Sequence, residues 1–280
     1  MVDRRSALAE PLQLSTGVCI PRLGLGVFRA GSGEGTRNAV RWAIESGYRH
    51  IDTAAVYRNE AEVGEALRQC ELPRQQVFVT TKLWRDDYGY DNTLRAFEGS
   101  LGRLQLDVID LYLMHWPSPG TRVETWRAMV ALAESGRARA VGVSNFTIDH
   151  LQELIDATGI APSTNQVEIH PFLQQRELVL YCREHGIAVE AWAPLTKAQR
   201  LGDPVLGAVA SEVRRSVAQV LIRWSLQKGF IVLPKSSNRS RIRENRSVFD
   251  FSLSDEQMAR IDGLDESYRT APGWDPSSTP

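Results

Sequence analysis

The 280-residue sequence has few cysteines, no excess of either charge and no long apolar run. Cys19, Cys70 and Cys182 are odd in number and far apart, which is typical of neither a disulfide framework nor a clustered zinc site. This pattern favours a reducing cytoplasm. The formal net charge is -1, from 33 basic and 34 acidic residues, so no global field would recruit nucleic acid or an anionic membrane.

No stretch of 18 or so uncharged apolar residues exists that could span a bilayer. The first residues, MVDRRSALAEP, include basic side chains but lack the apolar stretch of a targeting signal. We therefore expect a cytoplasmic protein without a membrane or nucleic-acid partner, in which residues 1–10 form a flexible N-terminus.

Short apolar runs alternate with longer stretches whose apolar residues recur three and four positions apart, such as TLRAFEGSLGRL and VAQVLIRWSLQK. The runs predict strands at residues 22–26, 50–52, 77–82, 108–114, 140–144, 164–168, 188–192 and 231–234. Strands that alternate with helices in this number predict an α/β fold, a single (β/α)8 TIM barrel over residues 11–280 with extra C-terminal helices. The segment LQLSTGVCIP, before the first strand, predicts a β-hairpin that plugs the bottom of the barrel.

Polar and aromatic side chains gather where the predicted strands end. In a TIM barrel the loops at the carboxyl ends of the strands carry the chemistry, so these side chains are site candidates. They are Asp52, Tyr57, Lys82, Trp84, His115, Trp116, Ser144, Asn145, Gln166, Glu168, Trp192, Lys235 and Ser236. Each has an ordinary alternative, such as a capping aspartate, a core histidine or a core tryptophan. Their coincidence at one rim favours a functional site.

Eight segments, spread in order over nearly the whole chain, resemble signature segments of the aldo-keto reductase family. They are GLGVF, HIDTAAVYRNE, TTKLW, LDVIDLYLMHWP, VGVSNF, NQVEIHP, EAWAPL and LPKSSNRSRIREN. HWP and EAWAPL are most similar to bacterial members that resemble 2,5-diketo-gluconate reductase. The resemblance implies an NADPH-dependent oxidoreductase that reduces small aldehydes or ketones to alcohols. It leaves one alternative, a catalytically idle NADPH-binding regulatory subunit of the same fold.

Asp52, Tyr57, Lys82 and His115 match the family's catalytic tetrad, and carbonyl chemistry accounts for them independently. Hydride delivery to a carbonyl carbon leaves negative charge on its oxygen, so the site needs a proton donor. Tyr57 is the expected donor, and the cation of Lys82 would favour its ionisation from an ordinary pKa of about 10. Asp52 would balance the Lys82 charge, and His115 would hydrogen-bond the substrate oxygen.

The resemblance also implies an extended NADPH across the barrel mouth, for which no GxGxxG loop is required. By this resemblance Ser144, Asn145 and Gln166 would bind the nicotinamide carboxamide, and Trp192 would stack on the ring. Lys235, Ser236 and Arg241 would bind the 2'-phosphate. Further expected cofactor contacts are Leu195, Ser237, Glu244 and Asn245. Taken alone, KSSNRSR is more typical of a solvated turn before a short helix than of a phosphate site.

Trp84 and Trp116, with Phe28 as a third wall, predict a partly apolar pocket for a small carbonyl substrate. Two features depart from the family and leave the substrate open. Arg85 stands where asparagine is usual, which would favour anionic substrates or place the charge in water. The tail TAPGWDPSSTP is unlike family tails. The histidines show no metal-ligand spacing, so we expect no metal site, a structural role for His170, and a monomer.

Overall fold

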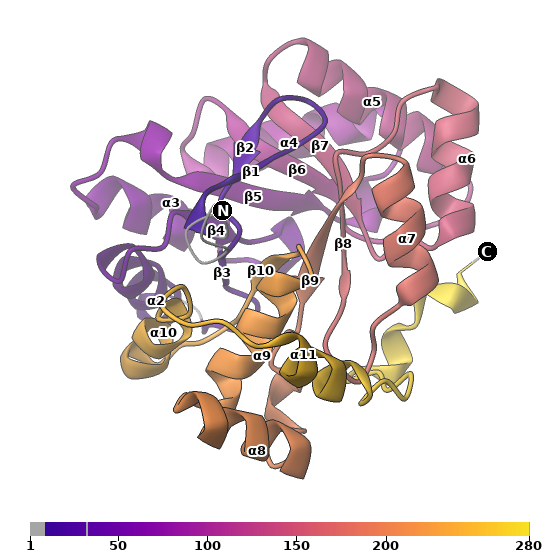
Figure 1. Cartoon of the computed structure of the whole chain (residues 1–280). Coiled ribbons are helices and arrows are strands. Elements are labelled where there is room, and N and C mark those ends of the chain that lie inside the picture. Colours follow the sequence, from indigo (N-terminus) through magenta and orange to yellow (C-terminus); the bar gives the residue numbers. More distant parts are fainter. Residues whose placement is uncertain (1–8, 32, 280) are drawn as a thin grey trace.

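Eight parallel strands form a barrel in the computed structural model, which describes residues 9–31 and 33–279 (Figure 1). The strands are β3 (Leu25–Gly26), β4 (His50–Asp52), β5 (Phe78–Leu83), β6 (Ile109–Met114), β7 (Ala138–Ser144), β8 (Thr164–Glu168), β9 (Ala188–Trp192) and β10 (Ile231–Leu233). Strands adjacent in the chain pair with each other. Parallel bridges from Leu23 to Val232 and from Gly26 to Lys235 join β3 to β10 and close the sheet. The predicted (β/α)8 barrel is confirmed.

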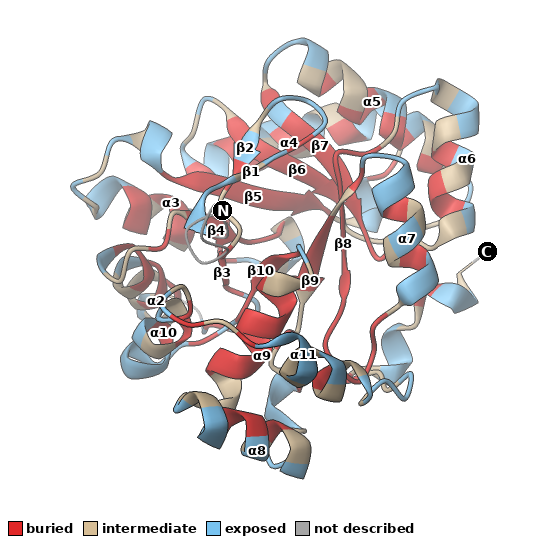
Figure 2. Cartoon of the chain, in the orientation of Figure 1, coloured by how far each residue is buried: buried red, intermediate tan, exposed pale blue. Residues whose placement is uncertain are grey.

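Helices connect the strands and cover the outside of the barrel, as parallel pairing requires (Figure 1). They are α2 (Glu34–Glu45), α3 (Glu60–Gln69), α4 (Tyr90–Leu104), α5 (Arg122–Glu134), α6 (Ile148–Thr158), α7 (Arg176–Glu184), α8 (Pro204–Val213), α9 (Val217–Gln227), α10 (Arg239–Arg246) and α11 (Asp255–Asp262). Their apolar faces pack on the strands, and Figure 2 shows the strands buried and the outer helix faces exposed. Trp126 of α5 and Trp224 of α9 are fully buried there.

The predicted strand boundaries lie within two residues of the observed ones, except at the start of the first strand. Residues 22–24 precede β3 and contribute only the bridge at Leu23. Gly24 lies against His50 of β4, and a Cβ at Gly24 would come within 2.7 Å of Nδ1 of His50. Only glycine permits this approach, because any side chain would clash with the buried imidazole.

The predicted hairpin is present and closes one end of the barrel. β1 (Leu12–Gln13) pairs with β2 (Cys19–Ile20) in antiparallel register. Leu14 and Ile20 pack against Leu111 and Ile231, which lie on barrel strands. The opposite end of the barrel is therefore the end available for a functional site. Most of the predicted flexible N-terminus falls on residues 1–8, outside the described part of the chain. Within the described residues no helix is long and apolar enough to cross a membrane.

Candidate active site

The rim at the carboxyl ends of the strands brings the four predicted tetrad residues together. Asp52 is the last residue of β4, and Tyr57 ends the 3-10 turn η1 (Ala55–Tyr57) that follows it. Lys82 is the penultimate residue of β5, and His115 directly follows β6. Because these three strands are neighbours in the sheet, the four side chains converge on one side of the rim.

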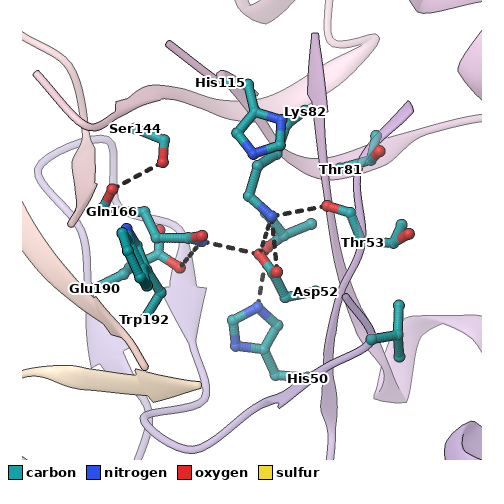
Figure 3. Close-up of polar contacts among 12 residues, drawn as sticks. His50, Asp52, Thr53, Thr81, Lys82, His115, Ser144, Gln166, Glu190 and Trp192 are labelled. Carbon is teal, nitrogen blue, oxygen red and sulfur yellow. Dashed lines mark hydrogen bonds and ion pairs between the residues drawn. The ribbon is translucent and has the colours of Figure 1, made fainter. Parts of the chain in front are cut away.

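Lys82 and Asp52 form a buried ion pair in the barrel interior (Figure 3). Nζ of Lys82 donates to Oδ1 of Asp52 at 2.7 Å, to Oδ2 at 2.8 Å and to the carbonyl oxygen of Thr53 at 2.8 Å. Burial alone would lower the pKa of Lys82, but Asp52 and Tyr57 outweigh it and raise the pKa. The site thus holds a fixed cation, whose desolvation the three acceptors offset.

Tyr57 lies beside this cation and beside the imidazole of His115. Its ring centroid is 5.2 Å from Nζ of Lys82 and 5.5 Å from the His115 ring, which it meets edge-on at 74°. Burial raises the pKa of Tyr57, Lys82 lowers it and Asp52 raises it, and the net direction is upward. The lowering effect expected of Lys82 is present, but burial outweighs it, so the net pKa of the phenol is raised.

His115 is a neutral imidazole, a property that the sequence did not reveal. Burial lowers its pKa well below the ordinary value, and the Lys82 charge lowers it further. Its Nδ1 is buried and has no hydrogen-bond partner among the described residues. A neutral imidazole donates through one ring nitrogen, so His115 can offer a hydrogen bond to a carbonyl oxygen without competing for its proton.

The residues predicted to bind the carboxamide lie at the end of β7, directly after it and on β8, beside the predicted stacking residue Trp192 of β9. Oγ of Ser144 donates to the carbonyl oxygen of Gln166 at 2.8 Å. Nδ2 of Asn145 donates to the carbonyl oxygen of His115 at 3.0 Å, and Nε1 of Trp192 donates to Oδ1 of Asn145 at 2.9 Å. Asn145 has the left-handed φ of 65° that asparagine tolerates. Asn145 therefore ties the Trp192 side of the rim to the tetrad.

Gln166 joins this group directly to the buried ion pair and also contacts Glu190, a residue that the sequence did not single out. Its Nε2 donates to Oδ2 of Asp52 at 2.9 Å and to Oε2 of Glu190 at 3.3 Å (Figure 3). Glu190 is completely buried in the middle of β9. Burial, followed by the charge of Asp52, raises the pKa of Glu190 to about 7. The sequence signal for Glu190 was an acidic residue inside the otherwise apolar predicted strand AVEAW.

The residues predicted to meet the 2'-phosphate follow β10 and open α10. Lys235 and Ser237 are exposed and Ser236 is buried, directly after the strand. Oδ1 of Asn238 accepts from the backbone nitrogen of Arg241 at 3.1 Å and caps the helix. Basic side chains and free backbone N–H groups at a helix start favour an anion.

Two further predicted contacts, Glu244 and Asn245, lie near the end of α10, where Asn245 is buried. Leu195 lies half-buried in the loop after β9. The same loop carries Lys197, which sequence reasoning missed, with its Nζ 5.7 Å from the Trp192 ring centroid. The predicted cofactor contacts thus follow β7, β8, β9 and β10, strands that are neighbours in the barrel.

Aromatic rings continue outward from the tetrad. The ring centroid of Phe28 lies 4.9 Å from that of Tyr57, and the ring centroid of Trp84 lies 5.3 Å from that of His115. Trp274, in the C-terminal tail, lies 6.4 Å from Trp84. It meets the predicted wall residue Trp116 edge-on, at 5.6 Å and 84°. Trp274 was missed because the tail resembled nothing that would place it at the rim.

The tail is anchored on both sides of Trp274. The backbone nitrogen of Thr270 donates to Oε1 of Glu168 at 2.8 Å, and His170 contacts the same oxygen at 3.3 Å. Nε1 of Trp116 donates to Oγ1 of Thr279 at 3.2 Å. The candidate rim residue Glu168 therefore holds the tail.

Arg85, the departure from the family pattern, lies at the edge of this aromatic group. Its guanidinium carbon is 5.2 Å from the Trp84 ring centroid. The side chain is exposed. Its guanidinium therefore lies at the exposed edge of the aromatic group, with Nε 3.8 Å from Oδ1 of Asp86.

Comparison with known proteins agrees with this geometry. Residues 22–266 match the sequence profile of the Aldo/keto reductase family. The relative named 9,11-endoperoxide prostaglandin H2 reductase, from Trypanosoma cruzi (strain CL Brener), is 50% identical over 268 residues, which cover 95% of this chain and 94% of the relative. The glyoxal reductase of Bacillus subtilis (strain 168) is 47% identical over 270 residues, covering 96% and 98%. A Bombyx mori aldo-keto reductase solved in complex with NADP is 40% identical, with a TM-score of 0.87 and 94% coverage of each chain.

Proposed function

Because the chain belongs to the aldo/keto reductase family, we propose that it is an NADPH-dependent oxidoreductase that reduces small aldehydes or ketones to alcohols. The observation that carries the proposal is the tetrad. A phenol, a neutral imidazole and a buried ammonium–carboxylate pair converge at one rim of the barrel.

The donor set beside the tetrad fits a nicotinamide dinucleotide phosphate. Ser144, Asn145 and Gln166 offer the hydroxyl and amide groups that a carboxamide needs, and Trp192 offers an aromatic face. Lys235 and Arg241 would hold the 2'-phosphate beside the start of α10. When bound, this cofactor supplies the hydride.

The protein's own residues would then manage the charge that develops on the substrate oxygen. Tyr57 donates the proton, and the raised pKa of its phenol ensures that the proton is present at neutral pH. His115 donates a hydrogen bond that orients the carbonyl and polarises it. Lys82, held by Asp52, stabilises the phenolate that remains after proton transfer.

The aromatic rings around the tetrad support small substrates. Trp274 contacts both Trp84 and Trp116 outside the tetrad, and these three large rings would favour a small substrate over a bulky one. The similarity to a glyoxal reductase supports short dicarbonyl compounds as one substrate class. We therefore include glyoxal-type dicarbonyls and simple aldehydes among the proposed substrates.

A panel of carbonyl compounds, monitored by the loss of NADPH absorbance, tests the proposal. We expect turnover of short aldehydes or dicarbonyls. If NADPH binds but no compound of a broad panel is reduced, the protein acts as the idle cofactor-binding subunit instead. If NADPH neither binds nor is oxidised, the assignment of the rim is wrong.

A further inference from the structure

Glu190 is a buried carboxyl group that the reduction chemistry leaves without a role. Its side chain comes from β9, beside Gln166 of β8, and the two residues are partners in the strand register. Figure 3 places it on the opposite side of Gln166 from Ser144, close to the Asp52–Lys82 pair. Burying a carboxyl group completely, as here, costs free energy unless the group is hydrogen-bonded or paired with a charge.

The amide group of Gln166 lies between two carboxyl groups. Its Nε2 donates to Oδ2 of Asp52 at 2.9 Å and to Oε2 of Glu190 at 3.3 Å. Nζ of Lys82 donates to both oxygens of Asp52, so these oxygens act as acceptors and can only accept from Gln166. The nitrogen of the Gln166 amide must therefore face inward. Within residues 9–31 and 33–279 the Gln166 amide makes both of these contacts through its nitrogen, so its oxygen is left for a ligand.

We propose that Glu190 is a positioning residue for the nicotinamide. Together with Asp52 it holds the Gln166 amide nitrogen in the barrel interior, so that the amide oxygen accepts a hydrogen bond from the N–H of the cofactor's carboxamide. This inference rests on the proposed function. Glu190 acts through Gln166 and does not itself touch the reacting atoms.

The arrangement also gives carboxamide binding a dependence on pH. Burial raises the pKa of Glu190 to about 7, and Asp52 adds to this rise while Lys82 opposes it. The neighbouring strands present the neutral Thr164 and Gln166 from β8 and the apolar Ile231 from β10. Ionised Glu190 is a strong acceptor for Nε2 of Gln166, whereas protonation weakens this acceptor, so that Asp52 alone holds the amide and its oxygen is presented less firmly to the carboxamide. Affinity for the nicotinamide part should therefore increase as pH rises through neutrality.

The test compares NADPH with 2'-phospho-ADP-ribose, which has the same adenosine and phosphates but no nicotinamide. Dissociation constants for both are measured by calorimetry between about pH 6 and pH 8 for the parent, for Glu190→Gln and for Asp110→Asn. Because NADPH and the fragment both carry the 2'-phosphate, the ratio of their dissociation constants removes the effect of 2'-phosphate ionisation. Asp110 is a matched control, because it is a buried carboxylate near the start of β6 that pairs with Arg74 and Arg139.

We expect Glu190→Gln to lower the preference for NADPH over the fragment by about three- to tenfold at the upper pH, which corresponds to one hydrogen bond. The preference should also lose its pH dependence. Asp110→Asn should keep the parent's preference at every pH. An unchanged preference in Glu190→Gln, or equal weakening of NADPH and fragment, would overturn the inference.

If Glu190→Gln does not fold, measurements on the parent protein alone still test the inference. The 3-acetylpyridine analogue of NADPH has no N–H to donate, so its affinity relative to the fragment should not vary with pH, whereas that of NADPH should. A pH-independent NADPH preference in the parent would overturn the inference while leaving the proposed function intact. Failure of the parent to bind NADPH at all would overturn both.

Discussion

Nζ of Lys82 lies 2.7 Å from Oδ1 of Asp52, and both side chains are buried in the barrel interior. The pair places a positive charge beside Tyr57 without exposing it to solvent. A lone ammonium at this depth would lose its proton or destabilise the fold, because removing one partner of a buried pair leaves an uncompensated charge. The pair is therefore required for the fold as well as for the chemistry.

Asp52→Asn should lower the free energy of unfolding by about 3 to 5 kcal/mol, because the carboxamide cannot balance the Lys82 charge. Urea unfolding monitored by tryptophan fluorescence measures the change. Glu45→Gln is a matched control, since Glu45 pairs with Arg239 on the surface at 3.1 Å and should cost less than about 1 kcal/mol. A loss no larger than the control's would mean that Lys82 is neutral in the folded protein.

Tyr57→Phe should remove nearly all carbonyl reduction, by about 10² to 10⁴ or more, because the ring remains while the transferable proton is lost. NADPH binding, followed by tryptophan fluorescence, should stay close to that of the parent. Tyr181→Phe is the control, because the Tyr181 hydroxyl donates to Gln152 on the helical exterior. Turnover in Tyr57→Phe close to that of the parent would exclude Tyr57 as the proton donor.

Lys235→Ala and Arg241→Ala should each reduce the preference for NADPH over NADH by roughly 10- to 10²-fold, as expected for the loss of a charge-assisted hydrogen bond to phosphate. Affinity for NADH should change little. Arg243→Ala removes an exposed charge from the same helix and should preserve the preference. Equal affinities of the parent for the two cofactors would mean that this loop does not bind the 2'-phosphate.

Glu190 should make the folded protein less stable as pH rises toward neutrality. Its pKa is about 7 in the fold against an ordinary 4.5, so between these values the folded state keeps a proton that the unfolded chain has lost. The free energy of unfolding therefore falls by about 3 kcal/mol in total as pH rises through this window. Above the window it levels off.

Glu190→Gln cannot ionise and should lack this contribution, so it should gain stability relative to the parent more at about pH 8 than at about pH 5. Urea unfolding at the two pH values measures the difference. A gap between variant and parent that does not change with pH would show that Glu190 ionises normally in the fold.

The barrel and most of its rim were predictable because their signals are local. Each strand is a short apolar run, and Asp52, Lys82 and Trp192 stand at or next to the end of one, where the sequence changes character. The parallel topology then brings these positions together without any further information.

Three features were not predictable, because each depends on contacts between distant segments. The net pKa of Tyr57 is a balance between burial and the Lys82 charge, and only the folded site sets its direction. Glu190 acquires its partner through Gln166, from another strand. Trp274 reaches the rim because Thr279 bonds to Trp116, 163 residues earlier in the chain.

Trp274→Ala should widen the pocket and change which substrates are preferred. More than half of the Trp274 side chain is exposed, so its loss should cost the fold little. What it removes is the wall that meets Trp84 and Trp116. We expect kcat/KM to fall by about tenfold for a small aldehyde and to rise for a bulky aromatic one, a discrimination of the size that one apolar wall supplies.

Steady-state kinetics with the two aldehydes, compared as a ratio, measures this change in preference. Leu180→Ala is the control, because Leu180 is similarly exposed on α7 and should leave the ratio unchanged. Because the tail is tied down by Glu168 on one side and Trp116 on the other, the Trp274 ring keeps its place only while both anchors hold. A ratio in Trp274→Ala equal to that of the parent would show that the tail covers the rim without shaping the pocket.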